Sequence, residues 1–200
     1  MTYHPKKNDQ GKPVHLSKPS TPTDASTWLS PEAMATATPG CALPAGFSQA
    51  CEAIPSDWES LAATMPVSEP AYPTGKTLSA GAIVFEPDGR IWLVSPSNGF
   101  GGYQFTFPKG KRDGAESLKA LALKEVWEES GLIIRLTGFL GDFERTTSTC
   151  RLYLAERISG NPAEMGWETQ AVHLVPKALL ASVLHHPTDL AVLDTLKTYF

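Results

Sequence analysis

The stretch that most constrains this chain of 200 residues runs from Gly110 to Leu132. It reads as a loop followed by a helix, with Glu116 near the start of the helix. Residues three and four positions apart share one face of a helix. Three later glutamates have this spacing: Glu125, Glu128 and Glu129. Such like-charged pairs cost a helix roughly 0.2–0.5 kcal/mol each, and the helix dipole disfavours anions at the C-terminal end.

The opposite face of the expected helix is apolar and predicts packing on a core. Its residues are Leu118, Leu121, Ala122 and Val126. Gly131 is the residue type that ends helices in the left-handed conformation. Carboxylates gathered on one face suit a hard cation, and all-oxygen ligation is typical of Mg²⁺ or Mn²⁺. The alternative interpretation is a solvated acidic face.

The whole stretch resembles the signature box of the Nudix hydrolases: Gly, five residues, Glu, seven residues, then Arg-Glu-hydrophobic-any-Glu-Glu-any-Gly-hydrophobic. Every specified position is present except one, where Lys124 replaces the arginine. The resemblance covers about residues 77–200 and implies an α/β fold, the Nudix α/β/α sandwich with a mixed β-sheet. We therefore divide the chain into an N-terminal extension, residues 1–75, and a Nudix domain, residues 76–200.

The extension is rich in proline, serine and threonine, and its prolines interrupt any long element. We expect an irregular chain with two short helices, one starting at Ser30 and one from a capping box at Ser56–Glu59. Three aromatic residues are out of place in a pure linker: Trp28, Phe47 and Trp58. The extension either drapes over the domain or a partner subunit, or forms a flexible arm.

From Lys76 onward, strand and helix patterns alternate. We expect strands at residues 79–85, 90–94, 104–107, 132–136, 137–145, 149–155 and 171–175. A glycine-rich loop occupies residues 97–103. Two C-terminal helices follow, one opened by Pro176 and one that starts near Thr188 or Asp189 and buries Leu190, Leu193 and Leu196.

The resemblance implies attack of water on a phosphorus of a nucleoside diphosphate linked to a second moiety. Divalent ions, Mg²⁺ or Mn²⁺, are the implied cofactor. By the resemblance, the metal ligands are Glu125, Glu128 and Glu129, with Gly110 (through its carbonyl) and Glu116 as additional ligands.

The resemblance leaves the general base open between the box and a later loop. In one arrangement the general base is a glutamate of the box, Glu128 or Glu129. In the other, the base comes from a loop ahead of a late strand, where Glu168 lies, with Glu144 and Glu164 as lesser candidates. In the family, the arginine at position 124 orients a box glutamate; lysine keeps the charge but loses the planar, two-bond geometry.

Cations near the start of the box helix and on the later strands are candidates for binding substrate phosphates. They are Lys109, Lys111, Arg112, Arg145 and Arg151. Tyr103 or Phe100, from the glycine-rich loop, is the candidate stacking surface for the other half of the substrate.

The segment Phe107–Gly110 resembles members that act on dinucleoside polyphosphates or diphosphoinositol polyphosphates, which we place ahead of ADP-ribose and nucleotide sugars. The alternative is a non-catalytic Nudix-fold module that senses a nucleotide. In a further alternative, the extension is a docking segment of an exported effector.

Composition and charge exclude several other roles. A formal net charge of −4 argues against bulk nucleic-acid binding. No apolar run is long enough to span a bilayer, and no secretory signal is expected. The three scattered cysteines fit a reducing, cytoplasmic setting. The expected partner is a small phosphoanhydride substrate, and analogy with the family suggests a homodimer.

Overall fold

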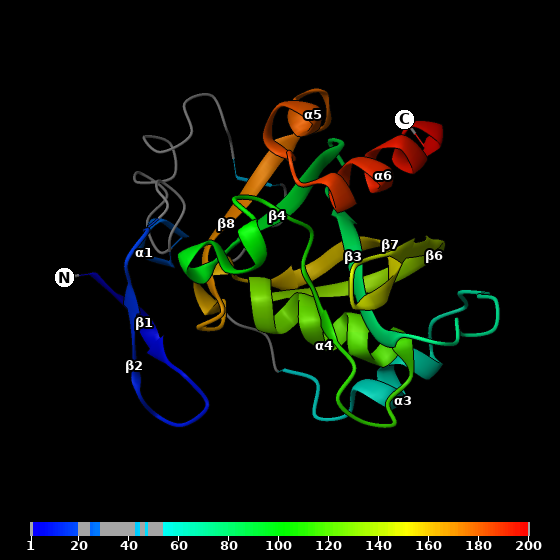
Figure 1. Cartoon of the computed structure of the whole chain (residues 1–200), viewed down its shortest axis with the longest axis horizontal. Coiled ribbons are helices and arrows are strands. Elements are labelled where there is room, and N and C mark those ends of the chain that lie inside the picture. Colours follow the sequence, from blue (N-terminus) through cyan, green and yellow to red (C-terminus); the bar gives the residue numbers. More distant parts are fainter. Residues whose placement is uncertain (1, 20–24, 29–42, 45–46, 48–53, 200) are drawn as a thin grey trace.

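The computed structural model describes residues 2–19, 25–28, 43–44, 47 and 54–199. Its centre is a six-stranded sheet in the order β6–β7–β3–β4–β8, with β5 paired to β3 (Figure 1). The strands are β3 (Thr77–Phe85), β4 (Arg90–Pro96), β5 (Lys109–Lys111), β6 (Leu132–Glu144), β7 (Ser148–Gly160) and β8 (Thr169–Pro176). β3 and β7 run parallel and the other neighbours antiparallel, so the expected mixed sheet is confirmed.

Helices cover both faces of this sheet (Figure 1). The helices of the domain are α4 (Leu118–Ser130), α5 (Leu180–Val183) and α6 (Pro187–Leu196). Short 3-10 turns connect the elements: η1 (Ser97–Gly102), η2 (Pro162–Glu164), η3 (Lys177–Leu179) and η4 (Lys197–Tyr199). Figure 1 shows α4 on one side of the sheet and α5 with α6 on the other.

Alternation along β3 divides the core between the two faces. Ala82 and Val84 belong to the apolar cluster that contains Leu121 of α4. Ile83, between them, belongs to a second cluster that contains Leu196 of α6. The two clusters make the α/β/α sandwich, as the sequence predicts.

Part of the extension packs against the domain. It contains the hairpin of β1 (Thr2–Lys7) and β2 (Pro13–Leu16), and the helices α1 (Ala25–Trp28) and α3 (Trp58–Ala63). Trp28 is 1% exposed, and its ring centroid lies 5.2 Å from that of Trp92 in β4. The described parts of the extension therefore drape over the domain. The helix expected at Ser30 lies outside the described residues, and the division at residue 75 stays a prediction.

The structure corrects several local expectations. The hairpin β1–β2 was not predicted. The N-cap of α3 is Asp57, which accepts the Ser60 N–H, while Glu59 accepts hydrogen bonds from Ser117 instead of closing a capping box. Leu190 is 46% exposed, because α6 buries Val192 in its place.

Two strand expectations also change. Residues 132–144 form one bulged strand rather than two, because the bulges near Gly138 and Gly141 bend β6 without breaking its pairing. Residues 104–107 form only an isolated bridge, from Thr106 to Val94. No helix among the described residues combines the length and apolarity needed to cross a membrane.

Candidate active site

Helix α4 presents its carboxylates at a fixed place because both of its ends are capped. At its start, Ser117 accepts a hydrogen bond from the backbone N–H of Ala120 at 3.2 Å. At its end, Gly131 has φ 70° and donates its N–H to the Trp127 carbonyl at 2.7 Å. A Cβ at Gly131 would overlap the carbonyl oxygen of Asn161, so only glycine fits.

Three glutamates gather in the last two turns of α4. Glu125 is buried, whereas Glu128 and Glu129 keep part of their surface in solvent. Burial, and then the charges of Glu129 and Glu128, raise the pKa of Glu125 to about 8. Burial also raises the pKa of Glu129 to about 7 and shifts the pKa of Glu128 upward. A cation placed among these groups would relieve their repulsion.

Strand β5 lies against these carboxylates. The backbone N–H of Lys109 donates to Oε2 of Glu129 at 2.7 Å. The next residue, Gly110, faces Glu125 so closely that a Cβ there would overlap the carboxylate. Pairing of Gly110 with Ala80 of β3 holds the strand in this position. Glycine at 110 therefore lets Glu125 approach the backbone of β5.

A segment before β8 closes the other side of the cluster. The N–H of Gly166 donates to the carbonyl of Glu128 at 2.6 Å, which caps the end of α4. Two residues further on, the exposed Glu168 is close enough that its charge raises the pKa of all three box glutamates. The structure thus brings the predicted loop carboxylate to the box.

The two lesser candidates for the base lie in ion pairs elsewhere. Glu144 pairs with Lys76 at 2.6 Å, and Glu164 pairs with Lys6 at 3.1 Å.

These donors fit a hard divalent cation, although the cluster is open. Among the described residues, no three His, Cys, Asp or Glu side chains are arranged to hold a metal ion. Mg²⁺ does not need a closed cage, because it usually binds one or two carboxylates, several waters and substrate phosphates. The residues that would hold it are Glu125, Glu128 and Glu129, with the Gly110 carbonyl beside them.

Glu116 lies ahead of α4, at the other end of the helix from Glu128 and Glu129. It precedes the first turn of α4 and lines a hollow of about 500 Å³ with Trp58 and Asp113. Leu118 and Glu125 are seven positions apart, about 10 Å along the helix axis. A role for Glu116 as an additional metal ligand stays a prediction.

Lys124 makes a looser contact than an arginine fork. Its Nζ lies 3.8 Å from Oε1 of Glu128, and both side chains are 42% exposed. The pair is a single point-charge contact, as expected for lysine at this position.

Of the predicted phosphate-binding cations, three lie on or beside β5. Lys111 is exposed. Lys109 donates from Nζ to Oγ1 of Thr106 at 2.7 Å and lies 4.6 Å from the ring centre of Tyr103. Arg112 is partly buried. Lys111 is the most accessible of the three.

The prediction for Arg151 is wrong. Its side chain is 0% exposed and donates to both oxygens of Asp142, at 2.8 and 2.7 Å. It also donates to Glu69 at 2.9 Å and to the Pro70 carbonyl at 3.0 Å. Arg151 therefore holds the extension to β7 rather than reaching a cleft. Alternation along the strand could not show that this position faces the extension.

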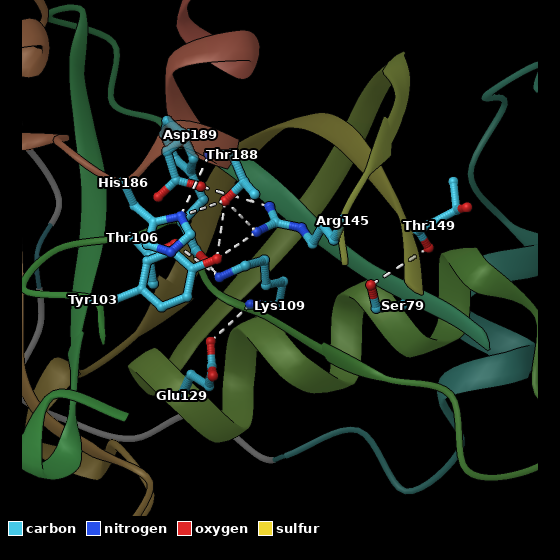
Figure 2. A network of polar contacts seen from close by, with 11 residues as sticks. Ser79, Tyr103, Thr106, Lys109, Glu129, Arg145, Thr149, His186, Thr188 and Asp189 are labelled. Carbon is cyan, nitrogen blue, oxygen red and sulfur yellow. Dashed lines mark hydrogen bonds and ion pairs between the residues drawn. The ribbon is translucent and has the colours of Figure 1, made fainter. Parts of the chain in front are cut away.

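Arg145 is also committed inside the protein. Figure 2 shows its guanidinium beside Tyr103 and Thr188, and it donates to their hydroxyl oxygens at 2.6 and 2.8 Å. Asp189, which is fully buried, lies 3.6 Å away. Because Arg145 joins the end of β6 to α6, it is not free to bind phosphate as predicted.

The two aromatic candidates differ in exposure. The ring of Tyr103 stacks on His186 at 4.0 Å, and its hydroxyl joins the same polar cluster (Figure 2). Phe100 is 82% exposed on η1. Of the pair, Phe100 has the free ring face for stacking.

Sequence reasoning missed one contributor, the hairpin β1–β2. Its Asp9 accepts a hydrogen bond from the indole of Trp167 at 3.0 Å, and His4 bonds the carbonyl of Thr169 at 2.8 Å. Neither residue belongs to a motif or a periodic pattern, so nothing in the sequence marked them.

Comparison with known proteins identifies the family of the domain. The family model of the NUDIX domain matches residues 75–196. An RNA pyrophosphohydrolase of Caulobacter vibrioides is 31% identical over 94 residues, which cover 46% of this chain and 51% of that protein. The chain thus spans about half the length of the curated relatives it matches.

Solved structures share the fold. A Nudix hydrolase from Nitrosomonas europaea matches with a TM-score of 0.55 and 14% identity, over 62% of this chain and 90% of that one. A structure of MutT, described for Aliivibrio salmonicida and Vibrio cholerae, matches with a TM-score of 0.53 and 22% identity, over 63% and 100%.

The sandwich with a carboxylate-bearing helix end defines the class of the Nudix hydrolases, which act on phosphoanhydrides. With more than half of its length matched, this chain belongs to the NUDIX family.

Proposed function

We propose that the protein is a divalent-metal-dependent hydrolase that cleaves a phosphoanhydride of a nucleotide-linked substrate. The observation that carries the proposal is the position of Glu125. It is buried beside Gly110, and its pKa is raised to about 8 by burial and by two neighbouring carboxylates. A purely structural helix has no reason to keep such repulsion, whereas a bound cation offsets it.

Mg²⁺ or Mn²⁺ is the proposed cofactor, since both prefer oxygen ligands. When bound, the ion neutralises the charge that develops on the phosphoryl oxygens. Glu125 and Glu129 would hold it, because β5 fixes both side chains from one side. Glu128 would complete the set from the exposed edge of α4.

Glu168 is the proposed general base. Its carboxylate is exposed, whereas Glu129 already accepts the N–H of Lys109. The pKa of Glu168 is raised, first by partial burial of the carboxylate and then by the charges of Asp9 and Asp113. A carboxylate with a raised pKa and access to solvent is suited to take a proton from water.

The cations favour a nucleotide-linked substrate over a diphosphoinositol polyphosphate. A densely phosphorylated inositol needs many free cations, and Arg145 and Arg151 are bound internally. Lys111 on β5 is exposed, and Phe100 offers an exposed ring for a base. We therefore place dinucleoside polyphosphates first, together with RNA, the substrate in the name of the Caulobacter relative.

A substrate panel with Mg²⁺ tests this proposal. It holds diadenosine tetraphosphate, 5′-triphosphate RNA, ADP-ribose and a diphosphoinositol polyphosphate, each with wild type and Glu128→Gln. We expect turnover of a nucleotide-linked compound that falls at least about a hundredfold in the variant, the scale of a lost electrostatic group. Tight nucleotide binding without any turnover would contradict the proposal and favour a sensing module.

A further inference from the structure

The segment that carries Glu168 is short and is held from several sides. Its backbone is fixed at Gly166, whose N–H bonds the end of α4. The carbonyls of Trp167 and Glu168 accept hydrogen bonds from Ser97, from its hydroxyl and its N–H respectively, both at 2.7 Å. These bonds fix the backbone of the segment, whereas the Trp167 indole is bonded by a residue of the extension.

The hairpin β1–β2 provides that hold. Its tip residue Asp9 accepts the indole N–H of Trp167 at 3.0 Å. On the other side of Glu168, the buried His4 bonds the Thr169 carbonyl at 2.8 Å. The hairpin therefore contacts the residues before and after Glu168.

The hairpin is itself anchored to the glycine-rich turn η1. Asn98 accepts the N–H of Ser17 at 2.7 Å and donates to the His15 carbonyl at 3.0 Å. Gln170 donates to the Lys18 carbonyl at 2.9 Å. Asn98 holds a left-handed conformation, φ 58°, which asparagine tolerates better than most residues. Its hydrogen bonds to the residues on either side of Leu16 make η1 the docking site of the hairpin.

Asp9 also influences the site electrostatically. Its charge raises the pKa of Glu128 and of Glu168, after the larger effect of burial. The tip of the hairpin thus lies beside the candidate catalytic carboxylates, although residues 1–74 lie outside the family match.

We propose that the hairpin β1–β2 is part of the active site and that Asp9 is a positioning residue, which holds Glu168 opposite the box carboxylates through Trp167. This inference rests on the proposed function, with Glu168 as base. It requires that Asp9 and Trp167 affect catalysis only through the position of Glu168.

Kinetics with the best substrate of the panel test this unit. In Asp9→Ala and Trp167→Phe, we expect kcat to fall five- to twentyfold with KM within twofold. Asp9→Asn keeps an acceptor for the indole and should retain at least half of kcat. Gln10→Ala, at the neighbouring tip position, is the matched control and should equal wild type.

A double-mutant cycle separates positioning from general destabilisation. In the Glu168→Gln background, adding Asp9→Ala should cause no further loss of kcat. A full additional loss there, or wild-type kcat in Asp9→Ala, would overturn the proposal.

Hydrogen exchange gives a readout that needs no turnover. Amides of residues 166–169 should exchange at least fivefold faster in Asp9→Ala, while those of α4 stay protected. Unchanged exchange would refute the hold of the hairpin even if no substrate were cleaved. If wild type cleaves no substrate but exchange is still faster in Asp9→Ala, the proposed function is refuted. The contact of the hairpin with residues 166–169 then stands, and its role in catalysis does not.

Discussion

Gly110 and Glu125 lie so close together that no side chain fits between the backbone of β5 and the carboxylate of the helix. The obstacle to a larger residue is the far end of a flexible side chain rather than a backbone atom. An added methyl group would therefore move the carboxylate and spare the fold.

Gly110→Ala should separate function from stability. We expect at least a tenfold loss of kcat/KM because Glu125 is displaced, with a free energy of unfolding within about 1 kcal/mol of wild type, the average effect of a single substitution. Gly138→Ala in β6 is the control, since its Cβ would make an ordinary contact of 3.5 Å with Leu154. Unfolding of Gly110→Ala below 37 °C, or full activity, would contradict this interpretation.

Glu125 should make the metal-free protein less stable as the pH rises. Its pKa is about 8 in the folded state and about 4.5 in the unfolded state. Between these two pH values the folded state therefore binds more protons than the unfolded state. Stability therefore falls between about pH 4.5 and 8, by at least about 1 kcal/mol, the value of one pKa unit.

Urea unfolding in EDTA at pH 5 and pH 8 measures this effect. Glu125→Gln should flatten the difference, and Mg²⁺ should raise the stability of wild type at pH 8. Equal pH dependence of wild type and variant would contradict the raised pKa.

Arg151→Ala should destabilise the fold by roughly 3–5 kcal/mol, because it leaves the carboxylates of Asp142 and Glu69 without the cation that pairs with them. Arg135→Ala is the control: its pair with Glu156 is more than half exposed and should contribute less than about 1 kcal/mol. Chemical unfolding measures both. A KM raised at least tenfold in Arg151→Lys without loss of stability would restore the phosphate-binding interpretation.

Lys124→Arg should tighten the hold on Glu128. The present pair, at 3.8 Å, is a single contact, and a guanidinium can donate twice to one carboxylate. We expect a two- to fivefold higher kcat/KM at limiting Mg²⁺. Lys119→Arg, on the same helix, controls for a general effect of arginine. A lower activity in Lys124→Arg would show that the site is adapted to lysine.

The sequence predicted the parts of this protein that follow from local spacing. The glutamates of α4, its apolar face and Gly131 occupy consecutive turns of one helix, so their arrangement depends on helix geometry alone. The family resemblance pointed to Glu168 ahead of a late strand, and its role as base stays a proposal.

What the sequence did not reveal depends on long-range packing. Arg151 alternates correctly on its strand, but its surroundings are set by Glu69, 82 residues away in the chain. Asp9 reaches the site only because the hairpin docks on η1, and no local pattern encodes that contact.

Direct binding of Mn²⁺, followed by the loss of the free-ion signal in electron paramagnetic resonance, tests the central claim most directly. We predict binding in wild type that weakens at least tenfold in Glu125→Gln and is unchanged in Glu116→Gln. Wild-type affinity in Glu125→Gln would contradict a metal site at the end of α4, and so would loss of binding in Glu116→Gln alone.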